Sequence, residues 1–131
     1  MEEMKVLTRK NIQDEIVNLM RIEIKTKKIR KLPTGFYDSF RKILGEYEVE
    51  ATAALENKDL TTYLRIREEE TRLKIDFKVF FQRRWEKISA YAPYDVDQET
   101  LSVLSSPEKA AILEFKAVYA KYFNQFIGGE Q

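Results

Sequence analysis

The chain has 131 residues, of which 44% are hydrophobic and 34% charged, the composition of a soluble globular protein with one hydrophobic core. It contains no histidine and no cysteine, so it lacks the commonest general base, the thiolate nucleophile and the ligands of most zinc and iron–sulfur sites; we expect no catalysis, metal or cofactor. Lys and Arg number 23 against 22 Asp and Glu, and this net charge of +1 excludes the overall basic excess typical of a dedicated nucleic-acid-binding protein.

The first predicted helix runs from about Thr8, its N-cap, to Lys27. Its apolar residues recur at helical spacing and form one buried stripe. They are Ile12, Ile16, Leu19 and Met20.

The second predicted helix follows Pro33, which disfavours the helical conformation for Leu32. Thr34 can then serve as the N-cap, and the helix ends near Asn57. Gly45 lies in its middle at a cost of about 1 kcal/mol relative to Ala, and close packing of another helix is the simplest reason for a glycine there.

The third predicted helix begins after its N-cap Asp59 and runs to Tyr91, shortly before the helix-breaking Pro93. It is about 50 Å long at 1.5 Å per residue, longer than the roughly 36 Å diameter of a compact domain of this size. The alternative is a break or bend near residues 68–70, with the two halves packed internally. An unbroken helix predicts that its aromatic end meets another subunit, because each large exposed side chain forfeits about 1.5–3 kcal/mol of burial. The predicted interface comprises Phe77, Phe80, Phe81, Arg84, Trp85 and Lys87.

A short helix from Asp97 to Leu104 and a last helix complete the pattern. Ser106 is the expected N-cap of the last helix, with Pro107 at its first position, and Gly128-Gly129 ends it. No strand pattern competes, so the fold class is all-α, a helical bundle with one long helix over residues 1–127, and residues 128–131 begin a linker or tail. The stripe of the last helix consists of Ile112, Phe115, Tyr119, Phe123 and Phe126.

Two clusters of basic residues are candidates for binding. Arg84 and Lys87 lie three residues apart on one helical face and can pair with carboxylates of a neighbouring chain or of this chain. The segment from residue 25 to residue 31 suits phosphate groups or an acidic partner, or is simply a solvated helix end that complements the helix dipole. Its five basic residues are Lys25, Lys27, Lys28, Arg30 and Lys31.

The remaining polar motifs indicate neither a metal site nor a catalytic residue. Three consecutive glutamates at 68–70 spread over about 200° of a helix and cannot converge on one ion. Ser105-Ser106 suits a helix cap better than a nucleophile, since no base is evident nearby. The chain has no phosphate-binding loop, no dinucleotide fingerprint and no zinc spacing. We therefore predict a non-enzymatic protein that binds other proteins.

Three segments resemble the helical A domain of the Sld-five/Psf-one type of subunit in the archaeal GINS complex. Residues 29–37 resemble the basic, Leu-Pro-x-x-Phe-Tyr signature that opens the second helix, carried here by Leu32, Pro33, Phe36 and Tyr37. Residues 83–88 with Ala92 resemble the Arg-x-x-Lys-Ile…Ala stretch that ends the long helix, and residues 104–109 resemble the start of the last helix, although Lys109 departs from the family's usual residue.

The resemblance implies a non-catalytic subunit of a DNA-replication assembly. Such a subunit joins other GINS subunits, or copies of itself, in a tetramer that links the MCM helicase to a RecJ-like protein at the replication fork. Contacts with a DNA polymerase or primase, and a weak contact with DNA, stay open. The family usually adds a β-rich B domain after the helices, so this chain is either cut at the interdomain linker or lacks that domain.

The rival hypothesis is a stand-alone helical module that binds nucleic acid through residues 25–31. Under either hypothesis we expect a cytoplasmic, nucleoid-associated protein without a membrane partner. No apolar run reaches the length of a membrane span, and the acidic start of the chain, Met1 to Lys5, does not resemble a signal peptide.

Overall fold

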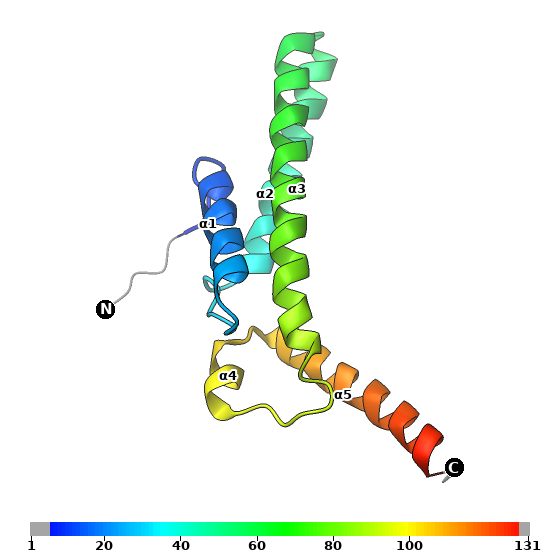
Figure 1. The fold of residues 1–131 in the computed structure, drawn as a ribbon. Helices are drawn as coiled ribbons and strands as arrows, with labels where there is room; N and C mark the ends of the chain where they lie inside the picture. The colour runs from blue at the N-terminus through cyan, green and yellow to red at the C-terminus, as the bar shows by residue number, and fades with distance from the viewer. Residues whose placement is uncertain (1–5, 129–131) are drawn as a thin grey trace. The chain divides into compact units, whose positions relative to one another are not determined.

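The computed structural model describes residues 6–128, and every regular element in that range is a helix (Figure 1). The all-α fold class is therefore confirmed. Residues 1–5 and, apart from Gly128, the predicted tail at 128–131 lie outside the described residues. None of the helices in the described range is both long and apolar enough to cross a membrane. The helices are α1 (Ile12–Lys25), α2 (Phe36–Glu56), α3 (Leu60–Ser89), α4 (Gln98–Val103) and α5 (Ser106–Ile127).

The chain divides into two compact units, which α1 and α3 both traverse. Unit 1 comprises residues 1–22 and 33–81, and unit 2 comprises residues 23–32 and 82–131. Unit 1 therefore contains α2, most of α1 and the first two thirds of α3. Unit 2 contains the basic segment, the end of α3, α4 and α5.

The long helix α3 is continuous over 30 residues, so the alternative of a break near residues 68–70 is wrong. Asp59 caps it as predicted, because its carboxylate accepts a hydrogen bond from the backbone N–H of Thr62 at 3.2 Å. Hydrogen bonding to Thr62, first through its side chain and then through its backbone N–H, lowers the pKa of Asp59 below its ordinary value. The end of α2 near Asn57 is also confirmed, and Lys58, in the left-handed conformation, completes the turn between α2 and α3.

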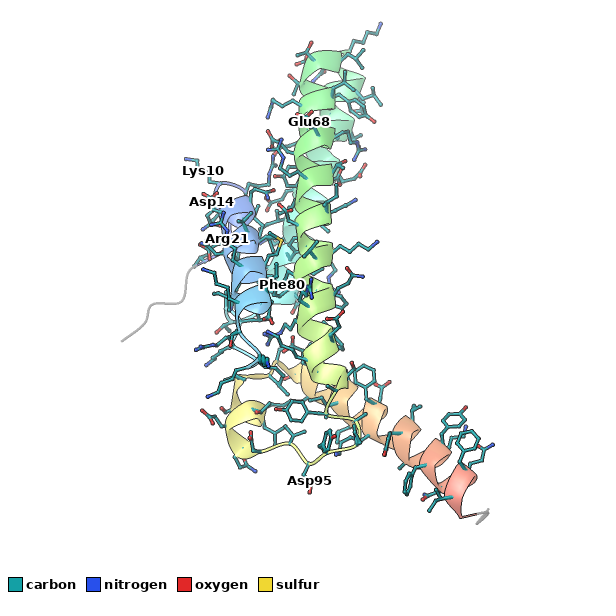
Figure 2. The ribbon with its side chains drawn as sticks, in the orientation of Figure 1. Lys10, Asp14, Arg21, Glu68, Phe80 and Asp95 are labelled. Atoms are coloured by element: carbon teal, nitrogen blue, oxygen red, sulfur yellow. The ribbon has the colours of Figure 1, made fainter. Side chains whose placement is uncertain are left out.

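An aromatic cluster forms the core of unit 1 between α2 and α3. Phe40 stacks on Phe77 with 4.1 Å between ring centroids, and Phe36 meets Phe80 edge-to-face at 5.4 Å. Such pairs add about 0.5–1.5 kcal/mol each to the burial of their area. Figure 2 shows Phe80 on α3, far along the helix from the exposed Glu68. Ile12 and Ile16 of α1 are also completely buried.

The core of unit 2 is smaller and mostly aliphatic. Ile88, Leu104 and Ile112 are its buried members, and Trp85 packs edge-to-face on Phe115 at 6.2 Å. Asp97 caps α4 by accepting a hydrogen bond from the backbone N–H of Thr100. Partly buried residues that pack around this core are Ile29, Trp85, Tyr91, Val96, Leu101 and Phe115.

Thr8 starts the turn that leads into α1, whereas two other predicted N-caps are wrong by one residue. The helix α1 begins at Ile12; before it, Oγ1 of Thr8 accepts the Asn11 N–H at 3.3 Å and the carbonyl of Thr8 accepts the Ile12 N–H at 2.9 Å. The N-cap of α2 is Gly35, not Thr34, because the chain enters the helix through a left-handed conformation (φ 66°) that glycine adopts without strain. The N-cap of α5 is Ser105, not Ser106, which places Pro107 at the second helical position.

Gly45 is not explained by close packing, since a methyl group at this position would meet no atom within 4 Å. We expect Gly45→Ala to raise the free energy of unfolding by about 0.5–1 kcal/mol, because alanine loses less backbone entropy in a helix. Urea denaturation measures the change. Gly35→Ala is the matched control and should lower stability instead, because its φ is positive. A loss of stability in Gly45→Ala would show that something packs on this site.

Candidate protein-binding surface

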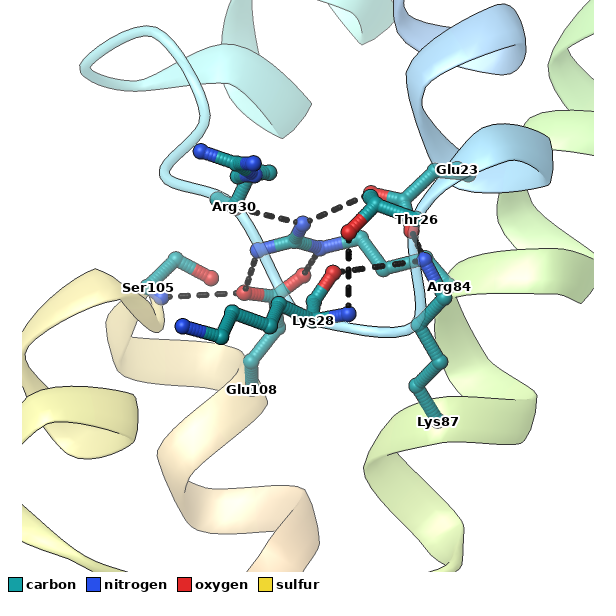
Figure 3. Close-up of polar contacts among 8 residues, drawn as sticks. All are labelled: Glu23, Thr26, Lys28, Arg30, Arg84, Lys87, Ser105 and Glu108. Carbon is teal, nitrogen blue, oxygen red and sulfur yellow. Dashed lines mark hydrogen bonds and ion pairs between the residues drawn. The ribbon is translucent and has the colours of Figure 1, made fainter.

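A buried charge cluster in unit 2 is centred on Arg84, which exposes none of its surface (Figure 3). Its Nε donates to Oε2 of Glu108 at 2.6 Å, and its Nη2 donates to Oε1 of Glu108 at 3.0 Å. The two residues thus form a bidentate ion pair. Its Nη1 donates to Oε2 of Glu23 at 3.0 Å and to the carbonyl of Arg30 at 2.7 Å. One guanidinium thus ties α3 to the end of α1, to the basic segment and to the start of α5.

Lys87 extends this cluster by one helical turn. Its Nζ donates to the second oxygen of Glu23 at 2.7 Å and to the carbonyl of Lys28 at 3.4 Å. Glu108 in turn accepts a hydrogen bond from the backbone N–H of Ser105 at 3.0 Å, at the start of α5. The cluster therefore balances two cations with two carboxylates, and it fixes the backbone of the basic segment on both sides of Ile29.

The pKa of Arg84 follows from these contacts. Burial alone lowers the pKa of Arg84, but its hydrogen bonds to Glu108 and the charges of Glu108 and Glu23 outweigh it, so the pKa lies above its ordinary value. The guanidinium therefore stays charged across the ordinary pH range. With its cations and carboxylates paired to one another, the cluster serves to position elements.

The sequence motifs predicted some members of this cluster and missed one. Arg84 with Lys87 and Glu108 belong to two separate segments of the family resemblance, and the structure brings these segments together. Glu23 was missed. Its signal is its spacing, since it continues the buried stripe of Ile12 and Ile16 along α1, and a carboxylate on a buried face requires a cation.

The predicted interface on α3 is mostly covered by the chain itself. Phe80 and Arg84 are completely buried, so they offer no surface to a neighbouring subunit, and this part of the prediction is corrected. The reason is that α2 covers Phe80 while carboxylates from α1 and α5 enclose Arg84. Phe77, Trp85 and Lys87 are half-buried, and Phe81 is 37% exposed. An interface through these four residues stays a prediction.

A run of exposed apolar side chains lies on the last three turns of α5. Of the stripe predicted there, Ile112 is buried and Phe115 half-buried, whereas the residues that follow are exposed, up to 78% for Phe126. Two ring pairs stack along the helix, Tyr119 on Phe123 at 5.9 Å and Tyr122 on Phe126 at 6.4 Å. We call this surface the α5 face; it consists of Val118, Tyr119, Tyr122, Phe123, Phe126 and Ile127.

The α5 face has the spacing of a helix-pairing seam. Ile112, Phe115, Tyr119, Tyr122 and Phe126 are alternately three and four residues apart, the period that buries one stripe against a neighbouring helix. The first two of these residues pack in the core of unit 2. The same seam therefore continues from a covered region into an exposed one.

The other predicted site residues have the following positions. Leu32, in unit 2, and Phe36, in unit 1, are buried, and Pro33 and Tyr37 of unit 1 are half-buried. The cations of the basic segment all belong to exposed residues of unit 2. No carboxylate within residues 6–128 lies at ion-pair distance from the side chains of Lys25, Lys27, Lys28, Arg30 and Lys31.

The glutamates at 68–70 differ in environment. Glu70 is buried beside Arg67 and Lys74, at 2.8 and 3.4 Å, whereas Glu68 is exposed. In the described part of the chain no group of three or more acidic residues is arranged to hold a metal ion. Glu70 thus pairs with cations of its own helix, and the three glutamates form no common site.

The candidate functional surfaces are therefore an exposed apolar helix face and an exposed basic segment, both in unit 2. Aromatic residues on a helix face are typical of protein interfaces, and clustered cations are typical of surfaces that bind acidic partners or phosphates. Comparison of this chain with protein-family models, with curated proteins and with solved structures finds no match.

Proposed function

We propose that this protein is a non-catalytic subunit of a protein assembly and that it joins its neighbour through the α5 face. The observation that carries the proposal is the row of exposed large apolar side chains along the last turns of α5. Each such side chain forfeits about 1.5–3 kcal/mol of burial while it faces water. A neighbouring helix that covers the row recovers this free energy.

The more specific proposal is that the assembly is a GINS-type replication complex. It is supported by the three segments that resemble the helical A domain. The ion pair between Arg84 and Glu108 adds to this support, because it joins the second and third segments in one unit. In this proposal the chain is a scaffold at the replication fork, in a tetramer of sister subunits or of its own copies, and it links the MCM helicase to a RecJ-like protein.

The α5 face is tested by the oligomeric state of the purified chain. We expect wild-type protein to form dimers or larger species in sedimentation equilibrium, and Tyr122→Ser/Phe126→Ser to weaken the association at least about tenfold, because aromatic anchors of interfaces contribute about 2 kcal/mol or more. Leu64→Ser/Ile75→Ser removes two apolar residues that are equally exposed on α3 and should leave the association unchanged. Far-UV circular dichroism confirms that each variant is folded.

Two outcomes would contradict this part of the proposal. A wild-type chain that stays monomeric at high concentration, both alone and mixed with a recombinant archaeal GINS sister subunit, has no subunit interface. Association that survives the α5 substitutions but is lost in the α3 control moves the interface to α3. If the chain associates with itself but binds neither the sister subunit nor MCM helicase, the proposal of an assembly subunit stands and the proposal of a GINS-type complex fails.

The second candidate function is nucleic-acid binding, favoured by the exposed cations of the basic segment. It predicts tight binding to DNA that weakens steeply as salt rises, because phosphate contacts release counterions. Fluorescence anisotropy with a labelled oligonucleotide at several salt concentrations distinguishes the two functions. Negligible binding supports the assembly subunit, and tight, salt-sensitive binding supports the rival.

A further inference from the structure

A groove in unit 2 runs between the basic segment and the end of α3, apart from the residues of the α5 face. It is an open groove with a volume of about 490 Å³. Its apolar lining comes from Ile29, Ala90, Tyr91 and Tyr94. Lys27, Glu86 and Lys87 complete it.

Hydrogen bonds hold both walls of this groove in place. Arg84 and Lys87 bind the carbonyls of Arg30 and Lys28, which are the two neighbours of Ile29 in the chain. Ile29 is therefore fixed on both sides. A groove whose walls are ordered before binding loses less conformational entropy when a ligand enters.

The opposite wall is tied down in the same way. The backbone N–H of Tyr94 donates to the carbonyl of Tyr91 at 2.9 Å, which closes a tight turn after α3. The carbonyl of Tyr94 accepts a hydrogen bond from the side chain of Lys116 on α5. The Tyr94 side chain nevertheless stays 66% exposed, so an apolar ring lies open at the mouth of the groove.

The basic wall of the groove is positively charged. Lys27 lines the groove, and the other four cations of the basic segment are its exposed neighbours in the chain, of which Lys28 interacts electrostatically with Asp97. On the α3 wall Lys87 is already paired with Glu23, so this wall presents the exposed carboxylate of Glu86. A complementary ligand places negative charge beside the basic segment and an apolar group against Ile29 and Ala90.

We propose that this groove binds a short acidic peptide segment of a partner protein, with one large apolar side chain inserted between Ile29 and Ala90 and its carboxylates facing Lys27 and the exposed basic segment around it. A peptide can present its acidic residues to the basic segment alone. A nucleic-acid strand carries a phosphate at every nucleotide, and some phosphates would face the exposed carboxylate of Glu86.

The test selects binders from a displayed library of short random peptides against the full chain. We expect the enriched sequences to combine Asp or Glu residues with one Phe, Trp, Leu or Ile. A labelled peptide of the enriched sequence is then titrated in fluorescence anisotropy, together with a copy in which serine replaces its large apolar residue. The serine copy should bind at least about tenfold more weakly, because it loses the burial of that residue.

Two variants of the chain locate the binding site. Ala90→Trp fills the groove without a change of charge, and the triple variant K25A/K27A/K28A removes three cations. Each variant should lower the affinity for the peptide at least about tenfold. The matched control K10A/K42A/K78A removes three exposed cations of unit 1 and should leave the affinity unchanged. Tyr122→Ser/Phe126→Ser should also leave it unchanged, which separates this proposal from the role of the α5 face.

Three results would overturn the proposal: no enrichment, enriched peptides without acidic residues, or peptide binding that Ala90→Trp leaves intact. Single-stranded oligo(dT) is titrated in parallel. The basic segment is a nucleic-acid site instead if two results hold together. Oligo(dT) binds more tightly than the peptide, and its affinity falls in K25A/K27A/K28A but not in Ala90→Trp.

Discussion

Replacement of Arg84 by methionine is expected to lower the free energy of unfolding by about 3–5 kcal/mol, the usual cost of removing one partner from a buried ion pair. The substitution keeps most of the side-chain volume but removes the guanidinium that holds both oxygens of the buried Glu108. It also removes the donor to Glu23 and to the carbonyl of Arg30. Urea denaturation at fixed ionic strength, followed by far-UV circular dichroism, measures the loss.

The double variant Arg84→Met/Glu108→Leu is the informative control. It removes one cation and one carboxylate together, and Glu23 keeps its ion pair with Lys87 at 2.7 Å. We expect it to regain about 1–4 kcal/mol over the single variant, because a well-packed apolar pair is often as stable as a buried ion pair. The recovery is incomplete, since Glu108 also caps the start of α5 through the N–H of Ser105. A cost below about 1 kcal/mol for Arg84→Met alone would show that water reaches this site.

Phe80→Ala should lower the free energy of unfolding by about 3–5 kcal/mol, the usual cost of emptying a fully buried phenylalanine site. Phe80 exposes none of its surface and contacts the rings of Phe36 and Phe77, at 5.4 and 5.7 Å between centroids. Both rings come from helices with extensive hydrogen bonding, so the site cannot collapse fully around the missing ring. Urea denaturation again provides the measurement.

Phe81→Ala is the matched control in the next position of the same helix. Its ring is 37% exposed, so the same truncation should cost about half as much. If both variants lose the same stability, the outer ring is also covered in solution. A concentration-dependent loss in Phe81→Ala would then assign that cover to a second chain.

Local signals in the sequence determined the helices and some of their ends. Asp59 caps α3 as expected, because a short carboxylate at the start of a helix satisfies free N–H groups whatever surrounds it, and Asp97 caps α4 in the same way. The shifts at α2 and α5 come from backbone dihedral angles that residue type alone does not specify. Thr34 and Gly35 are both acceptable caps, and the left-handed turn at Gly35 decides between them.

The candidate surfaces depended on tertiary structure. Helical spacing placed apolar stripes on α3 and α5, but the structure covers most of the first and leaves the last turns of the second exposed. The periodicity of a helix records which residues share a face; it does not record which segment lies against that face. The same holds for Arg84, whose partners Glu23 and Glu108 are 61 and 24 residues away in the chain. By itself the sequence determined the helices and their apolar faces, because both follow from neighbours a few residues apart; only the packing of distant segments decided which faces and charges are buried and which remain for a partner.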